Sequence, residues 1–75
     1  MSRLPQVKGS RMIAALTKEG WHVERTRGSH VIMRHESRSS VRVVVPVHGN
    51  PLKPGLLSSI LKHAELSVEA FKNLL

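Results

Sequence analysis

The spacing of hydrophobic residues along the chain predicts two principal helices and a short third one. Between residues 9 and 19, methionine, isoleucine and leucine recur at the interval that gathers apolar side chains on one side of a helix. Gly20 follows, where a helix commonly ends. Ser67 is suited to cap a short final helix. Before it lies the strongest helical stripe of the chain, formed by Leu56, Leu57, Ile60, Leu61 and Ala64.

Three stretches between these helices show the β-branched content and the alternation that are typical of strands. They cover residues 21–26, a second stretch from Ser29 or His30 to His35, and residues 41–47. The first two are separated by a tight turn at residues 27–29, whose central glycine tolerates a positive φ. Residues 36–40 are polar and predict a flexible hairpin loop before the third strand.

The middle strand has two chemically different faces. Val31 and Met33 share one face, whereas His30, Ile32 and Arg34 share the other. If the first pair enters the core, His30 and Arg34 point outward together, and Ile32 is an exposed apolar residue.

The order of the elements predicts one α+β domain that covers residues 1–75. A three-stranded antiparallel sheet in so short a chain has material to cover only one of its faces, so the helices should lie on one side. A helix, three antiparallel strands, a helix and a short C-terminal helix form the layout of a double-stranded-RNA-binding domain.

The net charge of the chain favours a nucleic acid as its partner. Twelve Lys and Arg residues oppose five acids, which gives a formal charge of +7 and a pI near 11.3. The cations are spread along the chain and do not form one basic amphipathic helix, which disfavours a membrane surface. Trp21 and Phe71 are the only aromatic residues, too few for a base-stacking platform. Contact with RNA should therefore run mainly through phosphate and sugar.

Several other classes are disfavoured by composition. The chain has no cysteine, and its histidines and acids are scattered, so we expect no metal site and no cofactor. No apolar run approaches the roughly 18 residues that span a bilayer, and no signal-peptide pattern is present. The expected compartment is the cytoplasm.

His30, in the sequence Gly28-Ser29-His30, is the candidate for proton transfer. An imidazole can give or accept a proton near neutral pH, as cleavage of an RNA backbone by its own 2′-hydroxyl requires. From the residues alone, the simpler alternative is an exposed histidine on a basic face.

Arg25, Arg27 and Arg34 are candidate phosphate contacts around that histidine. Lys53 precedes Pro54 and Gly55 at the expected start of a helix, where free backbone N–H groups favour an anion. The alternative interpretations are a solvated basic face and a plain strand-to-helix connection.

The segments "RGSHVIMRH" and "VVVPVHGNPLKPGLLSSILKHAELSVEAFKNLL" resemble the HicA family of bacterial mRNA interferase toxins. The resemblance runs from Leu4 to Leu75. Three segments carry it most specifically, and they are Gly28-Ser29-His30, Val45-Pro46-Val47-His48 and Leu52-Lys53-Pro54-Gly55. It implies a fold like that of double-stranded-RNA-binding domains and metal-independent mRNA cleavage that depends on His30. We also expect Ser29, directly before that histidine, to contact the RNA. The resemblance also implies a HicB-like antitoxin partner that covers the histidine.

The chain departs from the family pattern in two loops. The segment "HESRSS" looks longer than usual and "HGNPLKPG" looks shorter, and neither change touches His30. The second proton-transfer group is left open between His48 and water. The alternative functions are a non-catalytic double-stranded-RNA-binding module and, less favoured, a small DNA-associating protein.

Overall fold

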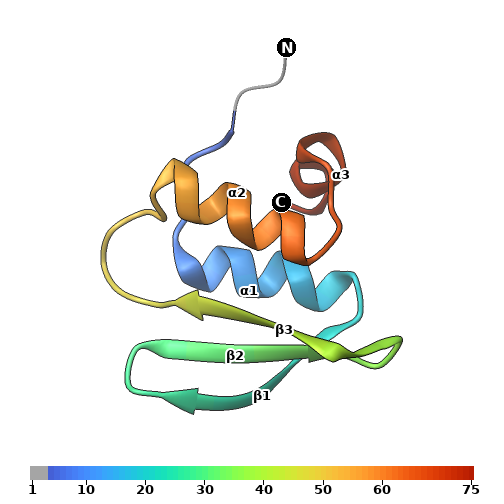
Figure 1. Cartoon of the computed structure of the whole chain (residues 1–75). Coiled ribbons are helices and arrows are strands. Elements are labelled where there is room, and N and C mark those ends of the chain that lie inside the picture. Colours follow the sequence, from blue (N-terminus) through green and yellow to red (C-terminus); the bar gives the residue numbers. More distant parts are fainter. Residues whose placement is uncertain (1–3) are drawn as a thin grey trace.

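A computed structural model describes residues 4–75, with Ser39 described by its backbone alone. The first three residues of the predicted domain lie outside this range. Two helices, α1 and α2, lie side by side on one face of the sheet, and α3 packs beside them (Figure 1). This α+β architecture confirms the predicted element order and is compatible with a fold like that of double-stranded-RNA-binding domains. In chain order the elements are α1 (Gly9–Lys18), β1 (Trp21–Arg27), β2 (His30–His35), β3 (Arg38–Pro46), α2 (Pro54–His63) and α3 (Val68–Leu74).

The helix boundaries follow from local chemistry. Gly20 has a φ of +97°, the left-handed conformation that ends α1 at little cost for glycine. Pro54 begins α2, where its missing N–H group is not needed. The Ser67 hydroxyl accepts a hydrogen bond from the Ala70 N–H at 3.0 Å and caps α3 as predicted. Among the described residues, no helix combines the length and apolar character needed to cross a membrane.

The sheet is antiparallel, in the order β1-β2-β3. Gly28, with a φ of +58°, forms the predicted tight turn between β1 and β2. The second hairpin is tighter than predicted, because its turn comprises only residues 36 and 37 and β3 already begins at Arg38. The predicted loop over residues 36–40 is therefore wrong. Polar residues 38–40 instead continue the strand, with an irregular register where Arg34 gives way to His35.

The core lies between the sheet and the helices. Its fully buried large side chains include Trp21 from β1, Met33 from β2, Leu57 from α2 and Phe71 from α3. Leu56 departs from the predicted stripe and is 39% exposed. Leu56 lies where α2 passes beside the edge strand β3, so its side chain is only partly covered.

Ile32 departs from prediction in the opposite direction. It pairs with Arg25 on β1 and with Val44 on β3, on the face away from the helices, yet it is only 6% exposed. Since the helices cannot cover it, its burial comes from side chains of the neighbouring strands on that same face. The outer face therefore has an apolar centre of its own.

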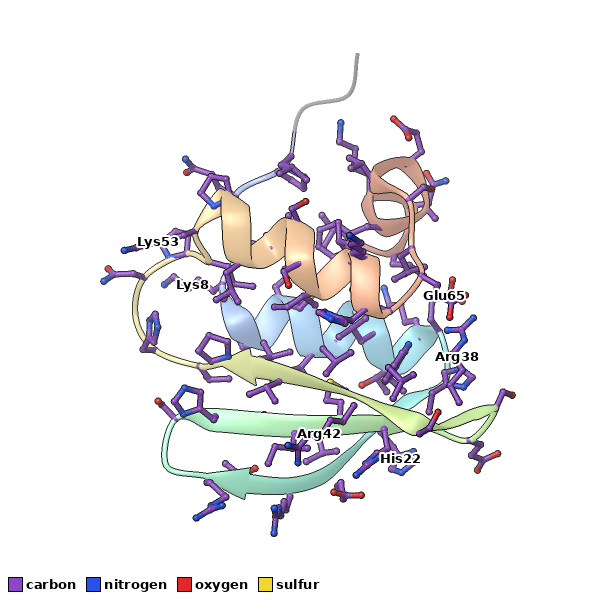
Figure 2. All side chains as sticks on the ribbon, viewed as in Figure 1. Lys8, His22, Arg38, Arg42, Lys53 and Glu65 are labelled. Carbon is purple, nitrogen blue, oxygen red and sulfur yellow. The ribbon has the colours of Figure 1, made fainter. Side chains whose placement is uncertain are left out.

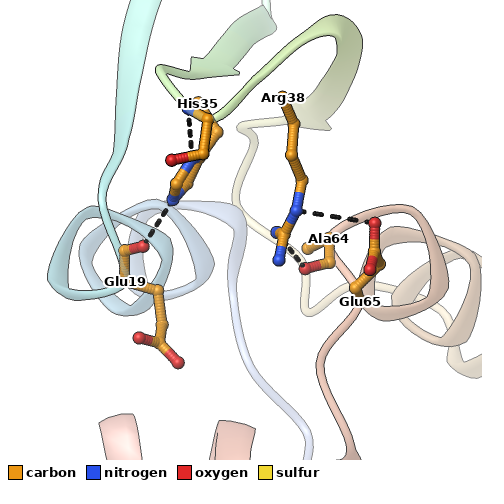
Figure 3. A network of polar contacts seen from close by, with 6 residues as sticks. Glu19, His35, Arg38, Ala64 and Glu65 are labelled. Carbon is orange, nitrogen blue, oxygen red and sulfur yellow. Dashed lines mark hydrogen bonds and ion pairs between the residues drawn. The ribbon is translucent and has the colours of Figure 1, made fainter.

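Polar contacts tie the second hairpin to both helices at one end of the molecule (Figure 3). The ring of His35 donates from Nε2 to the Glu19 carbonyl at 2.9 Å, because a carbonyl oxygen can only accept. Arg38 donates to the Ala64 carbonyl at 3.2 Å and lies 3.5 Å from the Glu65 carboxylate. The end of the sheet is thus fixed against the C-terminal ends of α1 and α2.

At the opposite end, α1 and β3 approach so closely that Gly9 has no room for a side chain. A Cβ atom at Gly9 would overlap the carbonyl oxygen of Pro46. We expect Gly9→Ala to lower the free energy of unfolding by about 1–3 kcal/mol, because backbone must move to admit the methyl group. Thermal denaturation should show a midpoint about 4–8 °C lower for each kcal/mol lost.

The matched control is Gly55→Ala, at the corresponding end of α2. Its Cβ would meet open space, so this variant should be as stable as the parent or more so. Equal midpoints for the two variants would contradict the close approach at Gly9.

The burial of Ile32 generates a second expectation. Ile32→Ala should cost about 2 kcal/mol or more, as for a core isoleucine, although the residue faces away from the helices. Val44→Ala, directly across on β3 and 39% exposed, should cost no more than about 1 kcal/mol. Urea denaturation of both variants measures the difference, and similar losses would mean that Ile32 has no special burial.

Candidate nucleic-acid interface

His30 is the first residue of β2 and lies on the outer face of the sheet, away from the helices. Its neighbours in the sheet are Arg27 on β1 and Pro46 on β3. The side chain is exposed, whereas the next residue, Val31, is 8% exposed and faces the helices. The predicted alternation of β2 is therefore confirmed at both residues. An exposed imidazole at the end of the sheet can be reached by a large substrate.

A β-bulge in β1 brings two arginines onto the same face as His30. Val23 pairs with Met33 and Arg25 pairs with Ile32, so Glu24 is an extra residue in the ladder. Strict alternation from Trp21 would have turned Arg25 and Arg27 toward the helices. The extra residue reverses their direction, and both guanidinium groups leave the sheet on the outer face. This feature was not apparent from the sequence.

The other arginines on the hairpins are in different electrostatic situations. Arg34 lies on the outer face as predicted, and its Nε donates to a Glu24 carboxylate oxygen at 3.0 Å. Part of its charge is compensated, which makes it a weaker phosphate contact than Arg25 or Arg27. Arg42, across from Arg34 on β3, adds an exposed cation to this face (Figure 2).

Ser29 and Lys53 lie at the same end of the molecule as His30: Ser29 directly precedes it, whereas Lys53 lies in the helical layer. Ser29 is in the turn before β2, and its carbonyl accepts a hydrogen bond from the Val47 N–H at 2.6 Å. Lys53 is the N-cap of α2, in the helical layer. The predicted RNA contacts therefore divide into an outer-face group and a helix-end group.

Lys8 joins the helix-end group, although sequence reasoning overlooked it. It is the N-cap of α1, and Figure 2 shows Lys8 and Lys53 near each other at this end. A hydrogen bond of 2.8 Å from the Leu52 N–H to the Val7 carbonyl ties the two helix starts together. The available signal was the matching position of a lysine directly before each helix.

Acidic residues gather toward one end of the molecule, where they offset the cations at the C-terminal ends of α1 and α2. The starts of α1 and α2 and the His30 turn occupy one end, where neither helix has an acid in its first turn. The end with the Arg38 network holds Glu19, Glu36 and Glu65, after the C-terminus of α1, in the β2–β3 turn and after α2. Polyanions should therefore be attracted to the His30 end.

The residues at the His30 end suit phosphate chemistry. The exposed imidazole of His30 lies among cations that can stabilise negative charge, and exposed His48 lies in the loop after β3. Among residues 4–75, no group of three or more His, Asp or Glu side chains is arranged to hold a metal ion.

Comparison with known proteins places this architecture in a family. The family model described as the HicA toxin of bacterial toxin–antitoxin systems matches residues 9–66, a span from the first residue of α1 to Leu66, just beyond α2. The match contains His30, the Glu24 bulge and the starts of both principal helices. No curated protein sequence matches the chain. Because the family model covers most of the chain, the protein belongs to the HicA family of toxins from bacterial toxin–antitoxin systems.

Proposed function

We propose that the protein is the mRNA-cleaving toxin of a type II toxin–antitoxin pair, with residues 1–75 acting as one domain. The observation that carries this proposal is the exposed His30, directly across from Arg27 on the sheet face that the helices leave open. Membership of the HicA family supports the role of toxin. RNA cleavage is the function that this histidine among cations serves best.

The reaction we propose uses the RNA's own 2′-hydroxyl. A base removes its proton, the oxygen attacks the adjacent phosphorus, and an O2′–P bond forms as the P–O5′ bond breaks. The departing 5′-oxygen takes up a proton, so the products are a 2′,3′-cyclic phosphate and a 5′-hydroxyl. His30 serves as the base or as the acid, since an imidazole can do either near neutral pH.

The second proton-transfer group is His48 or a water molecule. The hydrogen bond between the Val47 N–H and the Ser29 carbonyl holds the start of the His48 loop against the turn that precedes His30. This link supports His48 as a partner. The proposed reaction needs no metal, because the guanidinium groups of Arg25 and Arg27 would stabilise the negative charge that builds on the phosphorane.

Substrate binding is proposed to rest on the two groups of cations. Arg25, Arg27 and Arg34 would contact phosphates over the outer face, and Lys53 would do so from the start of α2. Ser29 would contact the RNA between them. A HicB-like antitoxin would inhibit the toxin by covering His30, whose side chain is exposed.

The central test is the His30→Ala variant. Loss of one proton-transfer group typically lowers a rate by about 10²–10⁴-fold. The fold should persist, because substitution at an exposed position usually changes stability by no more than about 0.5 kcal/mol. Cleavage of labelled RNA, RNA affinity and thermal midpoint should be measured together, with a chelator present to exclude metal-dependent contaminants.

His22→Ala is the matched control, because His22 is also exposed on the outer face but lies toward the other end of β1. It should retain activity. Full cleavage by folded His30→Ala would eliminate the proposed mechanism. RNA binding by the parent protein without any cleavage would instead support a non-catalytic RNA-binding module.

Binding should weaken steeply with salt. Four or five phosphate contacts on a single strand correspond to a log–log slope of about −3 to −4. Removing two of these contacts with Arg25→Gln and Arg27→Gln should reduce the magnitude of the slope by about 1.4. Fluorescence anisotropy over a range of salt concentrations measures both values.

Arg38→Gln removes one cation at the opposite end, where Arg38 is paired with Glu65. The slope for this variant should equal that of the parent protein. If Arg38→Gln instead lowers the magnitude of the slope by about 0.7, half the effect of the Arg25–Arg27 pair, net charge and not the outer face governs binding.

A further inference from the structure

A hollow of about 370 Å³ lies between α1 and the β1–β2 turn, on the side of the turn facing the helices. It exists because β1 is an edge strand that α1 covers only near Trp21. The rest of β1 is exposed, although Val23 and Thr26 pair with helix-facing residues of β2. The volume of the hollow falls at the lower end of the range of about 300–1,000 Å³ that is usual for small-ligand pockets.

The lining of the hollow combines an apolar floor with a hydroxyl rim. Its apolar surface is supplied by Ile13, Val31 and Val47. Its hydroxyl groups come from Ser10 on α1, Thr26 on β1 and Ser29 in the turn. Among the described residues, no protein hydrogen bond occupies these three side-chain hydroxyls. A ligand with a flat apolar body and a polar edge fits this combination.

The hollow and His30 lie on either side of the same turn. Gly28 lines the hollow, and a Cβ placed on it would meet nothing within 4 Å, so the tip of the turn is bare. An RNA backbone can therefore pass closely over Gly28. A nucleotide whose base enters the hollow would leave its neighbour's phosphate over the outer face, beside Arg27 and His30.

We propose that this hollow holds one unpaired nucleobase of the RNA, next to the scissile phosphate at which His30 deprotonates the 2′-hydroxyl or protonates the leaving 5′-oxygen. The proposal rests on the proposed ribonuclease function and adds a base-binding site to it. A base can lie on the apolar floor and exchange hydrogen bonds with the rim hydroxyls. An apolar side chain of a protein partner would instead bury those hydroxyls unpaired, which is unfavourable. The absence of acids from the first turn of α1, which borders the hollow, also favours a nucleic acid.

Binding of a single base in the hollow would allow RNA recognition by a protein with almost no aromatic residues. Both aromatic side chains, Trp21 and Phe71, are buried in the core at 2% and 0% exposure. Neither is available to stack on a base. Recognition of a single base in a pocket with aliphatic walls needs no exposed ring.

The test uses an RNA that the parent protein cleaves at one mapped position. Each nucleotide around that position is replaced in turn by an abasic one, and affinity is measured with the inactive His30→Ala variant. One abasic position should weaken binding by about tenfold, a value at the low end for a protein-bound base. The other positions should have little effect, because their contacts run through phosphate and sugar.

Thr26→Ile then fills the hollow while keeping a β-branched residue in β1. In this variant the intact RNA should bind about tenfold more weakly, and the abasic substitution should cause no further loss. Val23→Ile, on the same face of β1 but outside the hollow, should keep the abasic effect. If Thr26→Ile proves unstable, Ser10→Leu can fill the hollow from α1 instead. It should show the same weaker RNA binding and the same loss of the abasic effect.

The outcomes separate this proposal from the function on which it rests. If no abasic position weakens RNA binding while the parent protein cleaves RNA normally, the proposed base site is wrong and the proposed ribonuclease function stands. An abasic effect that survives both filling variants would place the base elsewhere. If filling the hollow weakens only the antitoxin complex, the hollow belongs to the protein interface and the proposal fails. Absence of RNA cleavage would reject the proposed function itself.

Discussion

Burial of only one face of the sheet is the constraint on which the rest of the structure depends. Two principal helices are enough to cover one side, where Val31 and Met33 of β2 enter the core. Alternation then sends His30 and Arg34 to the uncovered side, since adjacent strand residues point in opposite directions. The position of the candidate catalytic group is thus set by the same packing that stabilises the fold. Moving β2 by one residue would bury the histidine and expose the core.

The sequence predicted much of this arrangement because β2 alternates clearly and the helices carry regular apolar stripes. It did not reveal that Glu24 is an extra residue, because a bulge depends on how two strands pair and leaves no local pattern. Without the bulge, Arg25 and Arg27 would not share the face of His30. The burial of Ile32 was also missed, because it depends on neighbouring strands. The hollow beside Gly28 arises from incomplete coverage of β1, which only the packed structure displays.

The polar contacts of the second hairpin and the candidate site lie at opposite ends of the molecule. One end is closed by the contacts of His35 and Arg38 with backbone carbonyls of the helical layer. The other combines the starts of α1 and α2 with the bare turn, the cations and His30. The side chains of His30, Arg25 and Arg27 are exposed on the outer face of the sheet. Substitution of these three side chains can therefore report on chemistry with little disturbance of the fold.

The identity of the RNA ends after cleavage tests the central claim most directly. The account predicts a 2′,3′-cyclic phosphate, or the 3′-phosphate formed from it, together with a 5′-hydroxyl, because the 2′-oxygen is the nucleophile. It also predicts that a 2′-deoxy nucleotide at the cleavage position blocks the reaction. Products with a 3′-hydroxyl and a 5′-phosphate, or normal cleavage of the deoxy-substituted strand, would contradict the mechanism assigned to His30.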